Sequence, residues 1–115
     1  MSADYEGSPG PDSEFGSYET MRGFAGEDSL GSDFAIVRIY GGSENDYLFH
    51  QYAGEGGRAY LYGEDGDDQL FGAAGDDKSY GGSGNDWLWG GAGKNVYWGG
   101  SGRDHFGFFE LPDSR

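Results

Sequence analysis

The sequence predicts an all-β solenoid built from two short parallel sheets. Three observations point to it: a period of nine residues, glycines at the same places in each unit, and a regular alternation in the last three residues. From Gly63 the chain divides without a gap into five nonamers, GEDGDDQLF, GAAGDDKSY, GGSGNDWLW, GGAGKNVYW and GGSGRDHFG. A fixed repeat of this kind indicates small units that bury their apolar side chains by stacking on their neighbours.

Each nonamer predicts a tight turn followed by a short strand. Glycines at positions one, two and four allow the left-handed backbone conformations of such a turn. Positions seven to nine then point outward, inward and outward. The inward position eight is Ser79 in one unit and apolar in the others: Leu30, Ile39, Leu48, Leu61, Leu70, Leu88, Tyr97 and Phe106. Two nonamers make one coil with a strand on each side, and coils stack about 4.8 Å apart.

Upstream of Gly63 the repeat is less regular. Residues 54–62 keep the period but carry Ala59 where other units have Asp, and a four-residue insertion, residues 50–53, precedes them. Earlier units cover residues 23–49, and the first 22 residues show no period. The expected organisation is therefore an extended N-terminal arm or linker (1–22), a roll (23–108, with its best repeats at 63–107) and a short C-terminal tail (109–115).

The composition indicates a chain that needs a cation to fold. With 25 Gly, 35% hydrophobic residues and a formal charge of −14 among 115 residues, the chain has little apolar surface to offset the entropy of ordering. An aromatic content of 17% is nevertheless far above that of a disordered chain. A cation that neutralises carboxylates reconciles the two facts.

The same composition excludes several classes of partner. The chain has no cysteine, so it forms neither disulfides nor a Cys-type zinc site. Its acidity argues against nucleic acid and anionic membranes as partners. No stretch has the length and apolarity expected for membrane insertion. The N-terminus lacks the features of a signal peptide, so we expect either a signal that was removed or export that uses none.

The nonamers resemble the RTX (repeats-in-toxin) nonapeptide, G-G-x-G-x-D-x-U-x with U apolar. The resemblance covers residues 41–108 well and residues 23–40 poorly. It implies a right-handed parallel β-roll (a β-solenoid) that binds several Ca²⁺ ions in its turns and works outside the cell. Proteins of this kind are exported by type I secretion, unfolded in the low-Ca²⁺ cytosol and folded on exit.

Aspartates recur where the resemblance requires metal ligands. Because residues eighteen apart lie above one another, one side of the roll stacks Asp46, Asp68, Asp86 and Asp104, and the other stacks Ala59, Asp77 and Asn95. Ca²⁺ takes six to eight oxygen ligands, and both carboxylates and backbone carbonyls qualify. Stacked like charges repel each other without a cation.

The resemblance also implies which residues hold each ion. An ion lies between two turns on the same side, with carbonyls from positions one and three of one turn and from positions two and four of the next. Carried over, this gives one site of Gly63, Asp65, Asp68, Gly82, Gly84 and Asp86, and a second of Gly81, Ser83, Asp86, Gly100, Gly102 and Asp104. A third site, weaker by one carboxylate, comprises Gly72, Ala74, Asp77, Gly91, Gly93 and Asn95. A site at Asp46 depends on how the insertion is accommodated, and the unit of Ala59 lacks the side-chain ligand.

Position nine predicts an outward aromatic ladder on each sheet. One ladder comprises Tyr40, Tyr62, Tyr80 and Trp98, and the other comprises Phe49, Phe71 and Trp89 with Trp87 beside it at position seven. Two interpretations stay open. The rings shield neighbouring backbone, or they form an interface for self-association or for stacking on a sugar ring.

The sequence predicts a protein that is not an enzyme. It contains no paired acid and base, thiol or zinc motif, and His50 and His105 stand alone without a nucleophile. We expect a secreted calcium-binding β-roll that folds on binding Ca²⁺ and serves as a structural or self-assembling matrix or filament protein. The alternatives are a calcium-dependent folding and secretion module of a larger secreted enzyme, toxin or adhesin, and a module that binds carbohydrate or another surface.

Overall fold

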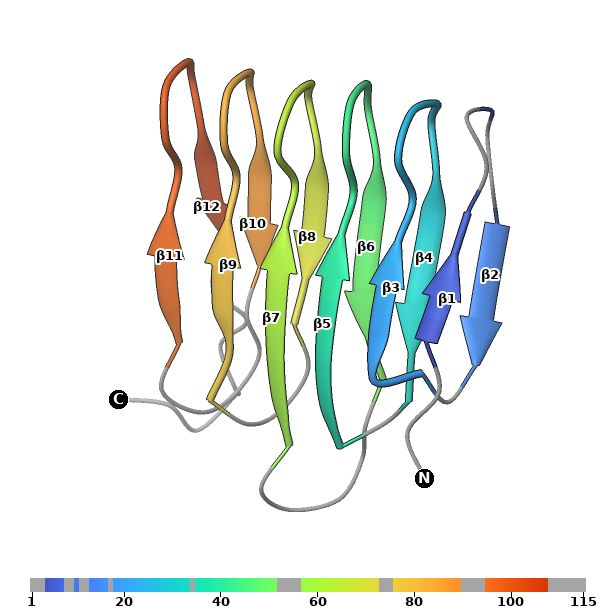
Figure 1. Ribbon diagram of the computed structural model, residues 1–115. Coiled ribbons are helices and arrows are strands. Elements are labelled where there is room, and N and C mark those ends of the chain that lie inside the picture. Colours follow the sequence, from blue (N-terminus) through green and yellow to red (C-terminus); the bar gives the residue numbers. More distant parts are fainter. Residues whose placement is uncertain are drawn as a thin grey trace.

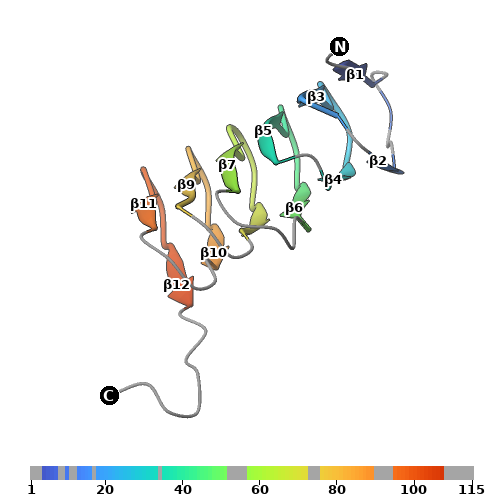
Figure 2. The same ribbon diagram turned by 90° about the horizontal axis from the view of Figure 1, so that it is seen from below.

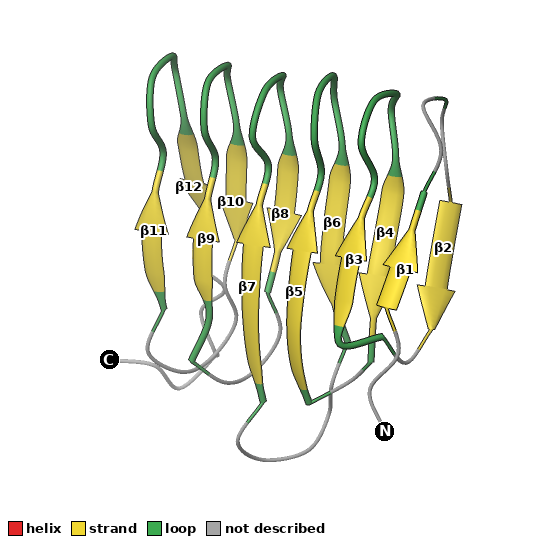
Figure 3. Ribbon diagram, viewed as in Figure 1, coloured by secondary structure: helices red, strands yellow, loops and turns green. Residues whose placement is uncertain are grey.

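The described part of the chain consists of strands joined by turns. The computed structural model describes residues 4–7, 10, 13–16, 18–33, 35–51, 57–72, 76–89 and 95–107. Over these residues it contains twelve strands and no helix (Figure 3). Accordingly, no helix in the described ranges has the length and apolarity to cross a bilayer. The predicted all-β fold is confirmed.

The strands form two parallel sheets that face each other (Figure 1). We call them the odd sheet and the even sheet. The odd sheet has the order β1 (Asp4–Glu6), β3 (Thr20–Arg22), β5 (Ile36–Tyr40), β7 (Arg58–Tyr62), β9 (Lys78–Tyr80) and β11 (Val96–Trp98). The even sheet has the order β2 (Ser13–Gly16), β4 (Ser29–Ser32), β6 (Tyr47–His50), β8 (Gln69–Phe71), β10 (Trp87–Trp89) and β12 (His105–Gly107). The chain alternates between the sheets, so each odd strand and the following even strand make one coil (Figure 2).

The strand register agrees with the predicted repeat. Leu88 pairs with Leu70, eighteen residues away, as the period requires. Leu70 in turn pairs with Leu48, and Leu61 pairs with Ile39, both at a separation of twenty-two residues. The four extra residues therefore lie between β6 and β7 and shift neither sheet out of register.

The coils begin upstream of the predicted boundary at residue 23. β1, β2 and β3 all lie within residues 1–22, which the sequence assigned to an extended arm. Gly7 N donates to Arg22 O at 2.7 Å, as Gly23 N does to Tyr40 O at 2.9 Å. The paired residues here are sixteen apart rather than eighteen, as in Glu6 with Arg22. This shorter offset hides the repeat, although residues 7–15 (GSPGPDSEF) keep its Gly, Gly and Asp. The predicted tail, residues 109–115, lies outside the described residues.

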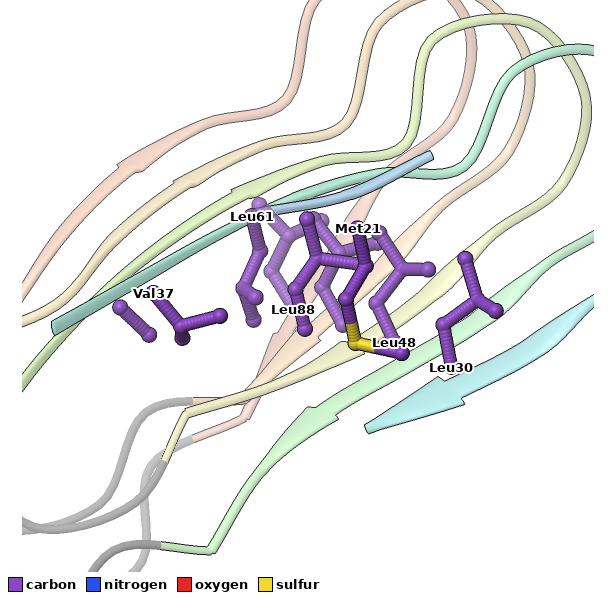
Figure 4. Close-up of a cluster of buried hydrophobic side chains, with 9 residues drawn as sticks. Met21, Leu30, Val37, Leu48, Leu61 and Leu88 are labelled. Carbon is purple, nitrogen blue, oxygen red and sulfur yellow. The ribbon is translucent and has the colours of Figure 1, made fainter. Parts of the chain in front are cut away.

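A thin apolar stripe fills the space between the sheets (Figure 4). Its buried members are Met21, Leu30, Val37, Ile39, Leu48, Ala59, Leu61, Leu70 and Leu88. Burial of each large aliphatic side chain contributes about 1.5–3 kcal/mol, so the stripe stabilises every coil by a small amount. Phe106, expected to be inward and buried, is 44% exposed because β12 is the last strand of the even sheet.

Candidate metal sites

One row of turns carries the predicted aspartate ligands. These turns connect odd strands to even strands and lie at the top of Figure 1. Each begins with a glycine and ends with an aspartate placed directly before an even strand. We call this set the aspartate column: Asp28, Asp46, Asp68, Asp86 and Asp104. The position is set by the repeat, because each turn occupies six residues between two strands of constant register.

From Asp46 onward, each aspartate accepts a hydrogen bond from the preceding coil through one carboxylate oxygen. The backbone N–H of Asp46 donates to Asp68 Oδ1 at 2.8 Å. That of Asp68 donates to Asp86 Oδ1 at 2.9 Å, and that of Asp86 to Asp104 Oδ1 at 3.0 Å. The column continues upstream, where Asp28 N donates to Asp46 Oδ1 at 2.9 Å. The insertion therefore leaves Asp46 in line with the other aspartates.

The second carboxylate oxygen faces a space that glycine keeps open. Oδ2 of Asp46, Asp68 and Asp86 is buried and has no hydrogen-bond partner. A Cβ on Gly63 would stand 2.5 Å from Asp68 Oδ2 and 2.8 Å from the carbonyl oxygen of Gly81. Because two oxygens converge where that Cβ would be, only glycine fits here. Such a pocket of converging oxygens has the chemistry that a hard divalent cation prefers.

The same arrangement recurs one coil further along. A Cβ on Gly81 would stand 2.5 Å from Asp86 Oδ2 and 2.8 Å from Gly99 O. The buried oxygens are thus a repeated feature of the turn row and not an accident of one turn. An isolated buried carboxylate is costly unless it is paired or bound to a metal, so the described residues fit a cation.

Backbone carbonyls add oxygens to the gap between successive turns. Glu64 O accepts a hydrogen bond from Ser83 N at 3.0 Å, and the carbonyls of Glu64 and Gly66 lie against Gly82 and Gly84 of the next turn. Gly81 O lies against Gly63 of the preceding turn. The gap is therefore lined by positions two and four of the first turn and position one of the second. The resemblance gave positions one and three to the first turn and positions two and four to the second, and its assignment of the ligands stays a prediction.

Burial raises the pKa of three aspartates in the column. It raises the pKa of Asp46 to about 8, that of Asp68 to about 9 and that of Asp86 to about 7. Repulsion by neighbouring carboxyls in the column adds to the effect of burial. Asp46 and Asp68 therefore hold protons near neutral pH unless a cation replaces them.

The opposite row of turns carries a shorter version of the same column. Ala59 N donates to Asp77 Oδ1 at 2.8 Å, and Asp77 N donates to Asn95 Oδ1 at 3.0 Å. A Cβ on Gly72 would stand 2.5 Å from Asp77 Oδ2. The other predicted ligands of this third site, Ala74, Gly91 and Gly93, lie outside the described residues.

A second column of side chains was not anticipated from the sequence. At position five, Asp67 N donates to Asn45 Oδ1 at 2.7 Å, Asn85 N to Asp67 Oδ1 at 2.8 Å, and Arg103 N to Asn85 Oδ1 at 2.8 Å. These bonds run from each coil to the one before, opposite in direction to those of the aspartate column. The signal was present in the sequence, since Asn45, Asp67 and Asn85 keep the spacing of the repeat.

Side chains alone do not form a compact metal cluster in the part of the chain that the structure describes, where no three His, Cys, Asp or Glu residues gather around one point. The geometry explains this, because each gap offers two aspartates and several carbonyls. A cation held here draws on backbone oxygens as much as on carboxylates.

The aromatic residues stack along the outside of both sheets. On the odd sheet, Tyr40, Tyr62, Tyr80 and Trp98 form a continuous ladder with ring centroids 4.7, 4.8 and 4.4 Å apart and nearly parallel planes. On the even sheet, Phe71 stacks on Trp89 at 4.6 Å, and Tyr47 lies between Phe49 and Phe71. Rings within a ladder cover each other's faces and present mainly their edges outward.

Comparison with known protein families supports the calcium interpretation of these turns. A family model described as the RTX calcium-binding nonapeptide repeat (4 copies) matches residues 52–79 and 71–106. No curated protein and no solved structure matches the chain. The matched residues contain Asp68, Asp77, Asp86 and Asp104, and the coils upstream of residue 52 extend the same architecture.

Proposed function

We propose that this chain, which is built on RTX calcium-binding nonapeptide repeats, is an extracellular protein that folds when it binds Ca²⁺. The folded chain then serves as a structural, self-assembling subunit. The observation that carries the folding part is the buried, unpartnered Oδ2 of Asp46, Asp68 and Asp86. Folding places these carboxyls in low-dielectric surroundings, above one another and against backbone carbonyls. Bound Ca²⁺ supplies the positive charge that such oxygens lack.

The extracellular location follows from the balance of charge and apolar burial. A chain with a formal charge of −14 and a thin apolar stripe gains little from folding before its carboxylates are neutralised. Extracellular calcium modules bind at about 10⁻⁴–10⁻³ M, so this chain stays unfolded in the low-calcium cytosol and folds outside. Export as an unfolded chain by a type I system fits that behaviour.

The self-assembling role is supported by exposed aromatic surface. On the even sheet, Phe15, Tyr47 and Trp87 are each at least 40% exposed, and contiguous exposed aromatic surface commonly marks an interface. The alternative is a folding and secretion module of a larger secreted enzyme, toxin or adhesin, and the length of the natural reading frame separates the two. Sugar stacking has less support, because stacked rings in the ladders offer few free faces.

A calcium titration followed by circular dichroism tests the folding part. We compare the wild-type chain with Asp68→Asn and Asp65→Asn, which each remove one negative charge. Asp68 is fully buried, whereas Asp65 is exposed and its side chain accepts a hydrogen bond from Ser83. At neutral pH we expect a β spectrum only with Ca²⁺, a midpoint raised at least about tenfold by Asp68→Asn, and a change below about threefold for Asp65→Asn.

Two results would contradict this proposal. One is an unchanged β spectrum in protein stripped by excess EDTA. The other is an equal shift for both variants, which would mean that net charge alone governs folding. Sedimentation velocity on the same samples, without Ca²⁺ and at about 5 mM Ca²⁺, above the expected affinity range, tests the assembly part. A compact monomer at every concentration would favour the folding module over the self-assembling subunit.

A further inference from the structure

The even sheet presents an uncharged face in a strongly acidic protein. The outward residues of its six strands include no Asp, Glu, Lys or Arg: Ser13, Phe15, Ser29, Gly31, Tyr47, Phe49, Gln69, Phe71, Trp87, Trp89, His105 and Gly107. The outward face of the odd sheet, by contrast, carries Asp4, Glu6, Arg22, Arg38, Arg58 and Lys78. The two faces have the same geometry and differ in charge.

The uncharged face is also a packed aromatic surface. Phe15 and Phe49 stack with centroids 5.6 Å apart and planes at 5°, although β4 lies between their strands. Gly31 makes this contact possible, because a Cβ there would overlap the ring of Phe49. Trp87 stacks on Trp89 at 5.2 Å and on His105 at 4.2 Å. The rings thus support one another across several strands and form a stiff surface.

Cations interrupt the corresponding surface of the odd sheet. Arg22 lies over the ring of Tyr40 at 5.3 Å, Arg38 over that of Tyr60 at 5.2 Å, and Lys78 over that of Tyr60 at 5.8 Å. These cations keep their heads in water while covering ring surface. The odd sheet is therefore suited to remain solvated, and the even sheet is not.

We propose that the even sheet is the contact surface between two copies of this chain, packed even sheet against even sheet about a two-fold axis. Copies with a charge of −14 repel each other wherever their carboxylates meet. In a contact between identical faces, the even sheet brings no like charges together, whereas the odd sheet would oppose its own Arg and Lys side chains. A face that pairs with itself also satisfies the requirement of an isologous interface, in which both copies use the same residues. This inference rests on the self-assembling part of the proposed function and names its interface.

The size of the face sets the strength of the contact. Six strands spaced about 4.8 Å apart extend about 24 Å, and the three or four residues of each strand add a width of about 10 Å. This area in plan, about 250 Å², is well below the roughly 800 Å² that each partner buries in a standard stable complex. We therefore expect a weak dimer and look for it at about ten to several hundred micromolar protein.

Sedimentation velocity of the full chain at saturating Ca²⁺, over that concentration range, tests the proposal. The matched variants are Gln69→Lys on the even sheet and Val96→Lys on the odd sheet. Both residues are exposed at position seven, and Lys78 already occupies this position on the odd sheet. We expect Gln69→Lys to weaken dimerisation at least about tenfold and Val96→Lys to leave it unchanged. Trp87→Ser and Trp98→Ser form a second pair, with the same expectation for the even and the odd sheet.

Salt distinguishes this interface from one based on ion pairs. Raising NaCl from about 0.1 to about 1 M shortens the Debye length from about 10 to about 3 Å. This screens repulsion between copies, so a contact through the uncharged face becomes stronger. Circular dichroism of the same samples identifies any variant that fails to fold. If Gln69→Lys or Trp87→Ser does not fold, the other of these two even-sheet variants tests the proposal.

Three outcomes would overturn the proposal. The first is folded wild-type protein that stays monomeric at hundreds of micromolar, which leaves calcium-dependent folding intact. The second is a dimer that is lost with the odd-sheet variants and kept with the even-sheet variants. The third is a dimer that weakens with salt, which would place the cations of the odd sheet against the acidic turns of another copy.

Discussion

The N-terminal coils (residues 4–32) and the regular coils (residues 61–89) contain the same parallel strand pairing. The first N-terminal coil differs in the groups that line its turn and its core. In both regions a glycine N–H donates to the carbonyl oxygen of the last residue in the next odd strand. Gly7 N donates to Arg22 O at 2.7 Å, and Gly63 N donates to Tyr80 O at 2.8 Å. At position four, however, a Cβ on Gly10 would meet nothing within 4 Å, whereas one on Gly84 would overlap the carbonyl of Gly66. Strand pairing therefore builds even the first coil, whereas close approach of oxygens between turns begins at the second, where a Cβ on Gly23 would overlap Asp28 Oδ2 and stand 2.9 Å from Gly41 O.

The inward position shows the same contrast. In the regular coils it is filled by Leu61, Leu70, Ser79 and Leu88, all buried. In β1 and β2 it is filled by Tyr5 and Glu14, which are only partly buried. Tyr5 packs on Tyr18 at 5.6 Å, and the hydroxyl of Tyr18 donates to Glu14. The first coil is therefore more polar at its inward position than the regular coils.

The largest expected effect is the pH dependence of folding without calcium. The unfolded aspartates titrate near 3.9, whereas burial raises the pKa of Asp46, Asp68 and Asp86 to about 8, 9 and 7. Below about pH 4 these carboxyls are protonated in both states, so burial costs little. Between pH 4 and 7–9 the unfolded chain binds fewer protons than the folded one, so stability falls as pH rises. In excess EDTA we expect more β structure at pH 5 than at pH 9 by circular dichroism.

This dependence should come from the buried carboxyls of Asp46, Asp68 and Asp86 and not from the exposed acids of the N-terminal coils. Asp68→Asn removes one of the raised groups and should flatten the pH profile. Asp4→Asn, an exposed residue of β1, removes the same charge and should leave the profile unchanged. With saturating Ca²⁺ the direction reverses, because protons compete with the cation. Stability in EDTA that rises from pH 5 to pH 9 would contradict the burial of these carboxyls.

The next effect compares the two glycines at position four. Gly84 has φ of +104° and lies against the carbonyl of Gly66, so Gly84→Ala introduces both backbone strain and a backbone overlap. We expect a loss of about 2–4 kcal/mol in the free energy of unfolding at saturating Ca²⁺. Gly10→Ala meets open space and should change it by less than about 0.5 kcal/mol. Chemical denaturation of both variants measures the difference, and equal losses would refute the contrast between the regions.

The sequence predicted the regular coils well because two independent patterns coincide there. The period aligns Leu70 with Leu88, and the alternation directs both into the core, so sheet, register and stripe follow together. The first coil was missed because its partner residues are sixteen apart, as in Ser13 with Ser29, and no search at a constant offset of eighteen finds it. The period of the repeat depends on the lengths of the turns, whereas parallel strands still pair when a turn is shorter.

In the candidate metal site, the alignment of the side chains could be predicted from the sequence, whereas the directions of the carbonyls could not. Spacing alone aligns Asp68 with Asp86, and burial of both follows from their place before an inward leucine. The direction of a carbonyl depends on the rotation of a peptide plane between two residues. Glycine permits both rotations. The residue types alone therefore do not tell that the carbonyl of Glu64, and not that of Gly63, lies against Gly82 of the next turn.

The smallest expected effect concerns the position-five column, which ties the exposed rims of the turns together. Asn85 Oδ1 accepts a hydrogen bond from Arg103 N at 2.8 Å at the surface, where water substitutes for a lost acceptor. Asn85→Ala should therefore lower the free energy of unfolding by only about 0.5–1 kcal/mol. Glu27→Ala, exposed at the same position of the N-terminal coils, is the matched control and should stay within about 0.5 kcal/mol. Chemical denaturation at saturating Ca²⁺ decides, and a loss above about 2 kcal/mol for Asn85→Ala would mean that the rim, and not the buried aspartate column, holds successive turns together.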